Sequence, residues 1–288
     1  MNEYLTTKEL ADLLRIKERK VYDLAASGDV PCSKAMGKLL FPRQAIDQWL
    51  ADNSTGPAHN RDRPGVFLGS HDPLLEWALL ESRCGIATFF DGSLDGLDRF
   101  EQHEGVATGL HLFDPDETSW NVTTVANRFK SQDIVLVEWA ERARGLIVRE
   151  QDPKSPTTLA DLGGKRVIPR QHEAGSQQLF EHLLAEAGLT LDSLSLTAPA
   201  RTENDAALAV LEDKADATFG LAAFARQYRL GFVPVVTERF DMMIDRHAWF
   251  EPPLQTFFTF CRSETFAAKA ADMKGYDTTG LGRVRFNA

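Results

Sequence analysis

The sequence predicts an α/β protein with a small N-terminal helical domain, a linker and a larger domain of two lobes. Residues 1–51 hold closely spaced amphipathic helical segments, and residues 52–65 are polar and rich in turn formers. From 66 to 288, short apolar runs alternate with helical stretches, which predicts parallel sheets covered by helices. A single sheet rarely needs so many residues. We therefore expect two lobes with a cleft between them.

Composition excludes several classes of protein. The chain of 288 residues has a net charge of −10, 43% hydrophobic residues and 26% charged residues, as in ordinary globular proteins. No apolar run approaches the roughly 20 residues that span a bilayer, and the N-terminus lacks the apolar core of a signal peptide. The three cysteines are too far apart for a disulfide framework or a metal site. We expect a cytoplasmic protein with reduced thiols, no metal, no cofactor and no membrane contact.

The N-terminal segment has strong helix boundary signals. Thr6 is an expected N-cap, and Glu9 stands three residues later, as a capping box requires. A second helix follows from Lys17 and ends before Gly28, which suits a C-cap. A short hairpin with Gly37 at its tip comes next, and a third helix begins after Phe41.

This order resembles the winged helix-turn-helix domain of MerR and excisionase proteins. The matching residues are Leu5-Thr6-Thr7-Lys8-Glu9, Val21-Tyr22, Gly28, Pro31, Phe41 and Trp49-Leu50. The resemblance implies that the second helix enters the major groove of operator DNA. By position, the candidate DNA contacts are Lys17, Arg19, Lys20, Tyr22, Lys34, Lys38 and Arg43.

Charge is unevenly distributed between the two predicted domains. Residues 1–50 carry eight Lys/Arg and seven Asp/Glu, a net charge of +1, so the remainder carries −11. Because electrostatic attraction to phosphates supplies much of DNA affinity, so weakly charged a domain should bind poorly alone. We therefore expect a homodimer or a higher homo-oligomer.

Several predicted strands of the larger domain end in small or hydroxyl residues that then open a helix. Ser70, Ser93 and Ser176 occupy such junctions, and Asn204-Asp205 is a fourth. Ligands of open α/β sheets bind beyond the carboxyl ends of strands, and free N–H groups at helix N-termini suit an anion. Each serine alone is most simply a helix cap, but their recurrence in both lobes favours a shared ligand site.

The larger domain resembles the PBP-like ligand-binding domain, which is related to type 2 periplasmic binding proteins and to molybdate/tungstate receptors. The resemblance is carried by Gly69-Ser70-His71-Asp72-Pro73, Gly92-Ser93-Leu94, Gly109-Leu110-His111, Trp120-Asn121, Gly175-Ser176 and Glu238-Arg239-Phe240-Asp241, among others. It implies two crossing strands, near Glu138–Gly145 and Thr237–Asp241, on which the lobes hinge. It also implies lobe I at about 66–140 and 242–288 and lobe II at about 145–237. The candidate ligand-binding residues are Ser70, His71, Gly92, Ser93, His111, Asn121, Arg170, Gly175 and Ser176.

The sequence departs from that family in one informative segment. Arg170, Gln171, Gly175 and Ser176 keep the family pattern, but the Thr-Arg pair that usually follows is replaced by Gln177-Gln178. A small carboxylate such as formate therefore rivals molybdate or tungstate as the expected ligand. Farther along, Phe257–Cys261 is predicted to be a buried strand.

These observations predict a one-component transcriptional regulator that senses a small anion. Two alternatives stay open: an excisionase-like architectural DNA-binder without a ligand, and an enzyme acting on a small anion. No catalytic residue is proposed, because Ser176 lacks a Gly-x-Ser-x-Gly context and no phosphate-binding loop or His-Glu-x-x-His motif is present.

Overall fold

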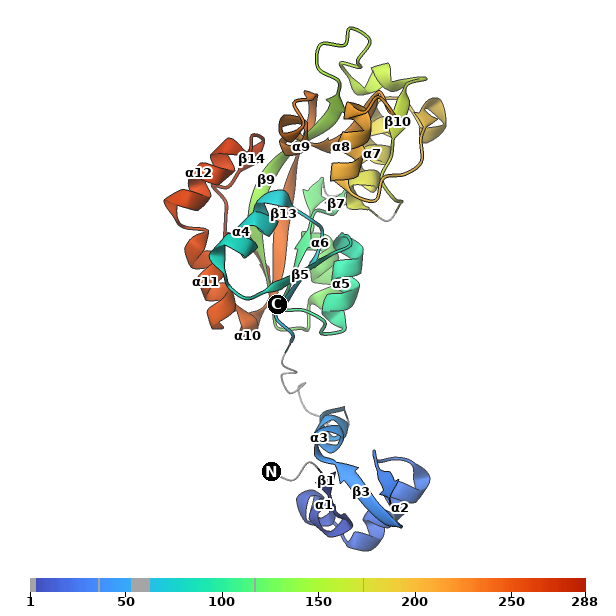
Figure 1. Cartoon of the computed structure of the whole chain (residues 1–288), viewed down its shortest axis with the longest axis vertical. Helices are drawn as coiled ribbons and strands as arrows, with labels where there is room; N and C mark the ends of the chain where they lie inside the picture. The colour runs from blue at the N-terminus through green and yellow to red at the C-terminus, as the bar shows by residue number, and fades with distance from the viewer. Residues whose placement is uncertain (1–3, 36, 53–62, 117, 173) are drawn as a thin grey trace. The chain divides into compact units, whose positions relative to one another are not determined.

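The computed structural model describes residues 4–35, 37–52, 63–116, 118–172 and 174–288 (Figure 1). The chain divides into two compact units, residues 1–62 and 63–288. Most of the expected linker, 52–65, lies outside the described residues. The mixed α/β class predicted from the sequence is confirmed, and each unit is described here by itself.

The first unit has a helix-turn-helix packed on a small sheet. Helices α1 (Thr7–Leu14) and α2 (Glu18–Ser27) are separated by a tight turn at Arg15, whose φ is 53°. The strands form an antiparallel sheet in the order β1-β3-β2. The remaining elements of this unit are β1 (Tyr4–Leu5), β2 (Ser33–Ala35), β3 (Lys38–Pro42) and α3 (Arg43–Asp52).

Local sequence signals fix the boundaries of these helices. The Glu9 carboxylate accepts a hydrogen bond from the Thr6 backbone N–H at 2.7 Å, and the Thr6 hydroxyl accepts one from the Glu9 N–H at 3.3 Å. Gly28 caps α2 with a φ of 78°. Both the predicted capping box and the predicted C-cap are therefore confirmed. The buried core of the unit consists of Leu5, Leu10, Ala11, Val21, Val30, Phe41 and Ile46.

The second unit is organised around one continuous sheet that serves both lobes. Its strand order is β11-β10-β12-β9-β13-β6-β4-β5, and β14 and β15 also pair with β9. Lobe I contains β4, β5 and β6, and lobe II contains β10, β11 and β12; neighbours within each lobe are parallel. The short strands are β4 (Val66–Gly69), β5 (Ala87–Phe90), β6 (Ala107–Leu110), β7 (Phe113–Asp114), β8 (Ser119–Trp120), β10 (Arg166–Ile168), β11 (Ser195–Leu196), β12 (Ala217–Leu221), β14 (Tyr276–Asp277) and β15 (Val284–Asn287).

Two long strands connect the lobes. Strands β9 (Ile134–Val148) and β13 (Gly231–Asp245) pair antiparallel along their whole length, and Figure 1 shows them running side by side between the lobes. Strand β9 pairs with β12 of lobe II, and β13 pairs with β6 of lobe I. The segments expected to cross between the lobes lie within these two strands.

Helices cover both faces of each half of the sheet. In lobe I, α4, α11 and α12 pack on one face, while α5 and α6 pack on the other with β15 (Figure 1). The helices of this unit are α4 (Pro73–Ser82), α5 (Ser93–Glu101), α6 (Val122–Phe129), α7 (Gly175–Glu186), α8 (Glu203–Leu211), α9 (Ala222–Gln227), α10 (Arg246–Trp249), α11 (Pro252–Phe260) and α12 (Glu264–Asp272), with 3-10 turns at Leu159–Leu162 and Leu191–Ser193.

The strand predicted over Phe257–Cys261 is wrong, because most of that segment is the end of α11. Leu254, Phe257 and Phe258 are buried against α4 and the sheet. A short apolar run has the same pattern in a buried helix as in a buried strand, so periodicity alone could not separate them. The two prolines that begin α11 were the local sign of a helix start.

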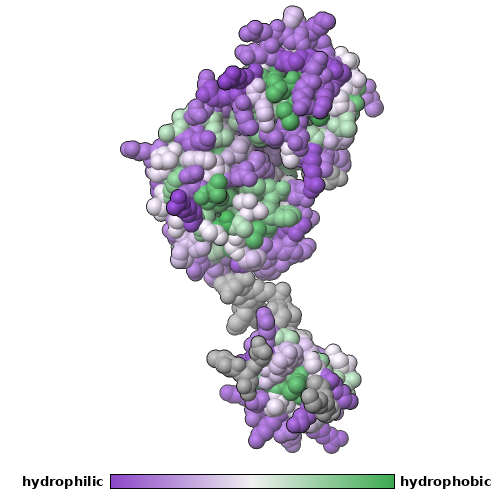
Figure 2. Space-filling view, in the orientation of Figure 1, coloured by the Kyte–Doolittle hydropathy of each residue, from purple (hydrophilic) through white to green (hydrophobic). Residues whose placement is uncertain are grey.

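Close backbone packing places α5 on the sheet. A Cβ atom added to Gly96 of α5 would lie 2.3 Å from the Gly69 Cα of β4, so no larger residue fits without moving the helix. This contact fixes the N-terminus of α5 beside the end of β4. The visible surface of the unit is mostly hydrophilic, with hydrophobic areas over lobe I (Figure 2). Within the described residues, no helix is long and apolar enough to cross a membrane.

Candidate functional site

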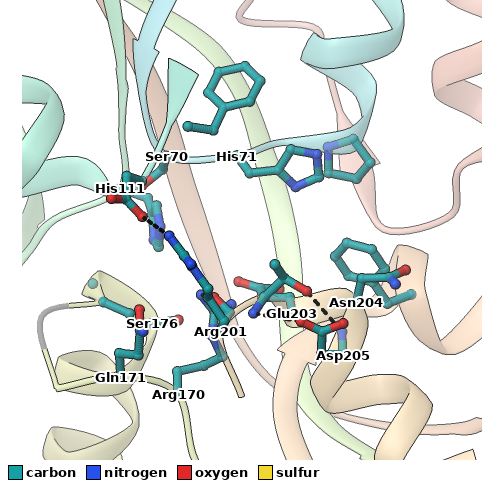
Figure 3. A pocket seen from close by; sticks show the side chains of 18 of the residues that line it. Ser70, His71, His111, Arg170, Gln171, Ser176, Arg201, Glu203, Asn204 and Asp205 are labelled. Carbon is teal, nitrogen blue, oxygen red and sulfur yellow. Dashed lines mark hydrogen bonds and ion pairs between the residues drawn. The ribbon is translucent and has the colours of Figure 1, made fainter. Parts of the chain in front are cut away.

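A pocket of about 780 Å³ lies between the two lobes of the second unit. It is lined by the loops that follow strands of both lobes and by the helix starts beyond them (Figure 3). The lining residues are Ser70, His71, Pro73, Glu76, Phe90, Asp91, Gly92 and His111 from lobe I, and Arg170, Gln171, Ala174, Gly175, Ser176, Arg201, Thr202, Glu203, Asn204, Asp205, Phe224 and Gln227 from lobe II.

The structure brings most of the predicted ligand-binding residues together at this pocket. Seven of the nine line it: Ser70, His71, Gly92, His111, Arg170, Gly175 and Ser176. Ser93 is fully buried behind the lining, and its hydroxyl lies 2.7 Å from that of Ser70. Asn121 does not line the pocket. Its side-chain oxygen accepts a hydrogen bond from the Leu112 N–H at 2.6 Å, and its amide donates to Asp241 at 2.8 Å, so it holds two segments of lobe I together.

Four helices begin at the pocket, and their first turns differ in capping. Helix α4 is capped by Asp72, whose carboxylate accepts a bond from the Leu75 N–H at 2.7 Å. Helix α8 is closed by a capping box between Thr202 and Asp205. In contrast, α5 begins after Gly92 and α7 begins after Ala174, and neither has a side-chain cap. The first N–H groups of α5 and α7, one helix from each lobe, thus lack side-chain caps beside the pocket.

The two arginines of lobe II that line the pocket are already engaged. Arg170 donates from Nε to the Ala200 carbonyl at 3.2 Å and from Nη2 to the Arg201 carbonyl at 2.7 Å. Burial lowers its pKa, and the Glu203 carboxylate opposes that effect. Arg201 is exposed and lies 3.9 Å from Asp91 of lobe I, and both residues line the pocket. The side chain of Arg170 therefore stabilises the loop before α8, while Arg201 links the two lobes.

Beneath the pocket runs a chain of buried charges that sequence reasoning missed. Arg142 and Arg144 on β9 flank Glu238 on β13, and both contact its carboxylate. Arg142 also binds Asp72 of lobe I at 2.8 Å, and Arg144 binds Glu203 of lobe II at 2.9 Å. Carboxylate and guanidinium thus alternate from one lobe to the other through the two crossing strands.

The charge chain reaches the pocket through His111. Its Nδ1 lies 3.2 Å from the Glu238 carboxylate, and its ring stacks on Phe240 with centroids 6.0 Å apart. Burial lowers the pKa of His111 despite the attraction of Glu238. Burial would raise the pKa of Glu238, but Arg142 and Arg144 lower it far below its usual value. The site therefore holds a neutral histidine against an ionised glutamate.

The expected DNA-contacting residues lie on the first unit. Lys17 is the N-cap of α2, and Arg19, Lys20 and Tyr22 lie on this helix, with exposed side chains. The side chains of Lys34 and Lys38 are exposed on the two strands of the hairpin. Arg43 is partly buried and pairs with Asp47 on α3 at 3.2 Å. The structure thus gathers most of these cations on α2 and the hairpin.

The predicted ligand-binding residues did not include the acidic part of the pocket, although Asp205 was expected at one of the helix starts. Glu76, Asp91, Glu203 and Asp205 all line it. A usable signal was present in the spacing of Thr202 and Asp205, which is that of a capping box and marks a helix start. Among the described residues, no group of His, Cys, Asp or Glu could hold a metal ion.

Comparison with known proteins identifies both units. A model of the PBP superfamily domain matches residues 77–262, and a model of a helix-turn-helix domain matches residues 4–54. YvgK of Bacillus subtilis (strain 168), an uncharacterized protein, is 24% identical over 302 residues, covering 97% of this chain and 96% of that protein.

Two solved structures share the fold of the second unit. The tungstate ABC transporter from Geobacter sulfurreducens is 12% identical, covers 74% of this chain and 100% of its own, and gives a TM-score of 0.53. A putative phosphate ABC transporter substrate-binding protein with bound phosphate from Clostridium perfringens is 13% identical. The match covers 76% of this chain and 99% of that protein's chain, with a TM-score of 0.52.

Neither domain model describes an enzyme family. A helix-turn-helix domain joined to a binding-protein domain is the composition of a DNA-binding regulator with a ligand-binding domain. The family match spans well over half of the chain and includes the helices that open the pocket in both lobes. The chain therefore belongs to the PBP superfamily and carries a helix-turn-helix domain at its N-terminal end.

Proposed function

We propose that this protein is a ligand-responsive transcriptional regulator that senses an anionic group in the pocket between its lobes. The ligand favours a closed arrangement of the lobes on β9 and β13, and closure changes the geometry of a homodimer bound to operator DNA. A ligand can shift this equilibrium only by binding one arrangement more tightly than the other. The ligand class, the dimer and the DNA contacts are parts of the proposal.

One observation carries the anion assignment: α5 and α7 both open at the pocket without side-chain caps. Their N–H groups carry the positive end of each helix dipole, and the two helices belong to opposite lobes. Ser70 and Ser176 add two hydroxyls, each at most 4% exposed. An anion held between them contacts both lobes and so favours closure.

Ligand binding is tested by the shift of the unfolding transition with molybdate, tungstate, sulfate, formate and oxalate. An anion at a hundredfold excess over its Kd should raise the free energy of unfolding by about 2.7 kcal/mol. Ser176→Ala should weaken the binding of that anion about tenfold, because one hydrogen bond to a charge is lost. Ser195→Ala, an exposed position on β11, is the control. No shift with any anion would refute the sensor.

DNA binding is tested with the double variant Arg19→Ala/Lys20→Ala on an operator obtained by selection from random DNA. Two phosphate contacts are lost, so the slope of log K against log salt should become shallower by about 2, with weaker binding. Lys130→Ala/Arg262→Ala removes the same charge from exposed positions of the second unit and should leave the slope unchanged. Equal slopes for the two variants would contradict the assigned role of α2.

Coupling between ligand binding and DNA binding is tested by titrating the protein with the same DNA, with and without the anion found in the unfolding assay. The proposed regulator changes its DNA affinity when the anion is present. An architectural DNA-binder would show the same affinity in both titrations, and an enzyme would consume the anion.

A further inference from the structure

The pocket and its floor carry more negative than positive charge. Six carboxylates face four guanidinium groups, and a bare oxyanion with two charges would add to this excess. The carboxylates belong to Asp72, Glu76, Asp91, Glu203, Asp205 and Glu238, and the guanidinium groups to Arg142, Arg144, Arg170 and Arg201. A ligand with one anionic group and one cationic group fits this distribution better.

Glu203 is the carboxylate best placed to meet such a cation. Its side chain is 13% exposed, lines the pocket, and holds Arg144 at 2.9 Å with Oε1. Its Oε2 accepts a long bond from the Leu221 N–H at 3.4 Å. Burial would raise the pKa of Glu203, but Arg144 and Arg170 lower it below its usual value, so the group is ionised. A carboxylate has about four acceptor positions, so Glu203 retains capacity for a ligand donor.

The start of α8 differs in character from the starts of α5 and α7. The backbone N–H of Asp205 is bound by the Thr202 hydroxyl at 3.0 Å, and the Asp205 carboxylate accepts from the Thr202 N–H at 3.3 Å. Glu203 and Asp205 also place two negative charges in the first turn of α8. This helix therefore offers acceptors to a ligand, whereas the uncapped helices offer donors.

These two kinds of helix start lie at different sides of the pocket. In the view of Figure 3, Ser176 of α7 lies toward the left, and Glu203, Asn204 and Asp205 lie toward the right. Ser70 and His111 also lie toward the left, and both are hydrogen-bonded to the Ser93 hydroxyl at the start of α5. The volume of about 780 Å³ is within the range of about 300–1,000 Å³ typical of pockets that enclose organic ligands. A formate or sulfate ion would leave most of this space to water.

We infer that the ligand is an amino carboxylate. Its carboxylate binds at the uncapped N-termini of α5 and α7, and its protonated amine binds Glu203 at the start of α8. This inference rests on the proposed anion site and extends it to the other side of the pocket. Specificity then comes from the separation of the two charges, because both subsites are fixed by helix starts.

A series of ω-amino carboxylates measures that separation. Glycine, 4-aminobutanoate and 6-aminohexanoate are compared with acetate, butanoate and hexanoate by calorimetry and by the shift of unfolding of the full chain. At least one amine should bind about tenfold more tightly than its deaminated partner, as expected for one charge-assisted hydrogen bond. This comparison uses the wild-type protein and needs no variant.

Glu203→Gln tests the assignment of the amine subsite. The variant should reduce the preference for the amine to about twofold or less. This preference is the ratio of the two affinities measured in the same variant, so a change in overall anion affinity cancels. Glu212→Gln, at the other end of α8, is the matched control and should keep the preference. A cooperative unfolding transition, measured for each variant without ligand, establishes that the variant is folded.

The outcomes separate this inference from the proposed function. Equal binding of both series would overturn the amino carboxylate and leave the anion site standing. Binding of inorganic oxyanions with no binding of either organic series would also overturn it and favour a bare oxyanion. If no anion of any kind binds, the proposed sensor function fails as well. A preference for the amine that persists in Glu203→Gln would contradict the role of Glu203.

Discussion

Replacing Glu238 by glutamine is expected to lower the free energy of unfolding by about 3–5 kcal/mol. Glu238 is fully buried between Arg142 and Arg144. Among the described residues, it is the only carboxylate that contacts both of these arginines. Glutamine keeps the shape of the side chain but removes its negative charge. Arg142 and Arg144 then stay buried without the carboxylate that they share. Urea unfolding measures the loss, with the slope of the transition compared between the two proteins.

The matched control for Glu238→Gln is Asp272→Asn. Asp272 pairs with Arg226 at 2.9 Å on the surface, where its side chain is 67% exposed. Loss of such an exposed pair should cost no more than about 1 kcal/mol. A loss below about 1 kcal/mol for Glu238→Gln would show that the charge chain does not hold the two strands together.

Replacing Asp241 by asparagine should change how stability depends on pH. Burial raises the pKa of Asp241 from 3.8 to about 6, although Arg239 and Asn121 favour its ionised form. The folded protein therefore keeps this proton up to about pH 6, whereas the unfolded chain releases it near pH 3.8. Between these values, the contribution of Asp241 to stability falls as pH rises, by up to about 3 kcal/mol in all.

The measurement is the difference in unfolding free energy between wild type and Asp241→Asn at pH 4, 5, 6 and 7. Wild type should lose stability relative to the variant up to about pH 6, and the difference should then level off. Taking the difference removes the opposite contribution of Glu238, which is lost as pH falls. Asp192→Asn at an exposed position is the control. A constant difference across this range would contradict the raised pKa.

Much of the first unit could be predicted from sequence because its signals are local. The Thr6 and Glu9 capping box and the Gly28 cap act within a few residues, and each is present in the structure. The positions of Gly92 and Ser176 at helix starts, and of Ser70 between β4 and α4, could also be predicted, since a strand followed by a small residue and a helix is a local pattern.

Two features could not be predicted from hydrophobic pattern and position alone: the helical state of Phe257–Phe260 and the role of Asn121. The identity of the Phe257–Phe260 segment depended on what buries it, and the segment is helical. Asn121 lies at a helix start, but its amide is hydrogen-bonded to the Leu112 N–H and to the Asp241 carboxylate. Asp241 lies on β13 and is 120 positions away in the sequence. The partners of Asn121 cannot be read from its neighbouring residues, whereas the two prolines at the start of α11 were a local sign of a helix.

The sequence by itself determined the two-domain composition, the helix starts and most of the pocket's hydroxyl and histidine residues. Only the tertiary structure decided that Asp72, Arg142, Glu238, Arg144 and Glu203 form one buried chain between the lobes. Capping and periodicity act over a few residues of the chain. A buried ion pair depends on which strands become neighbours, and here the partners are separated by 59 to 96 positions.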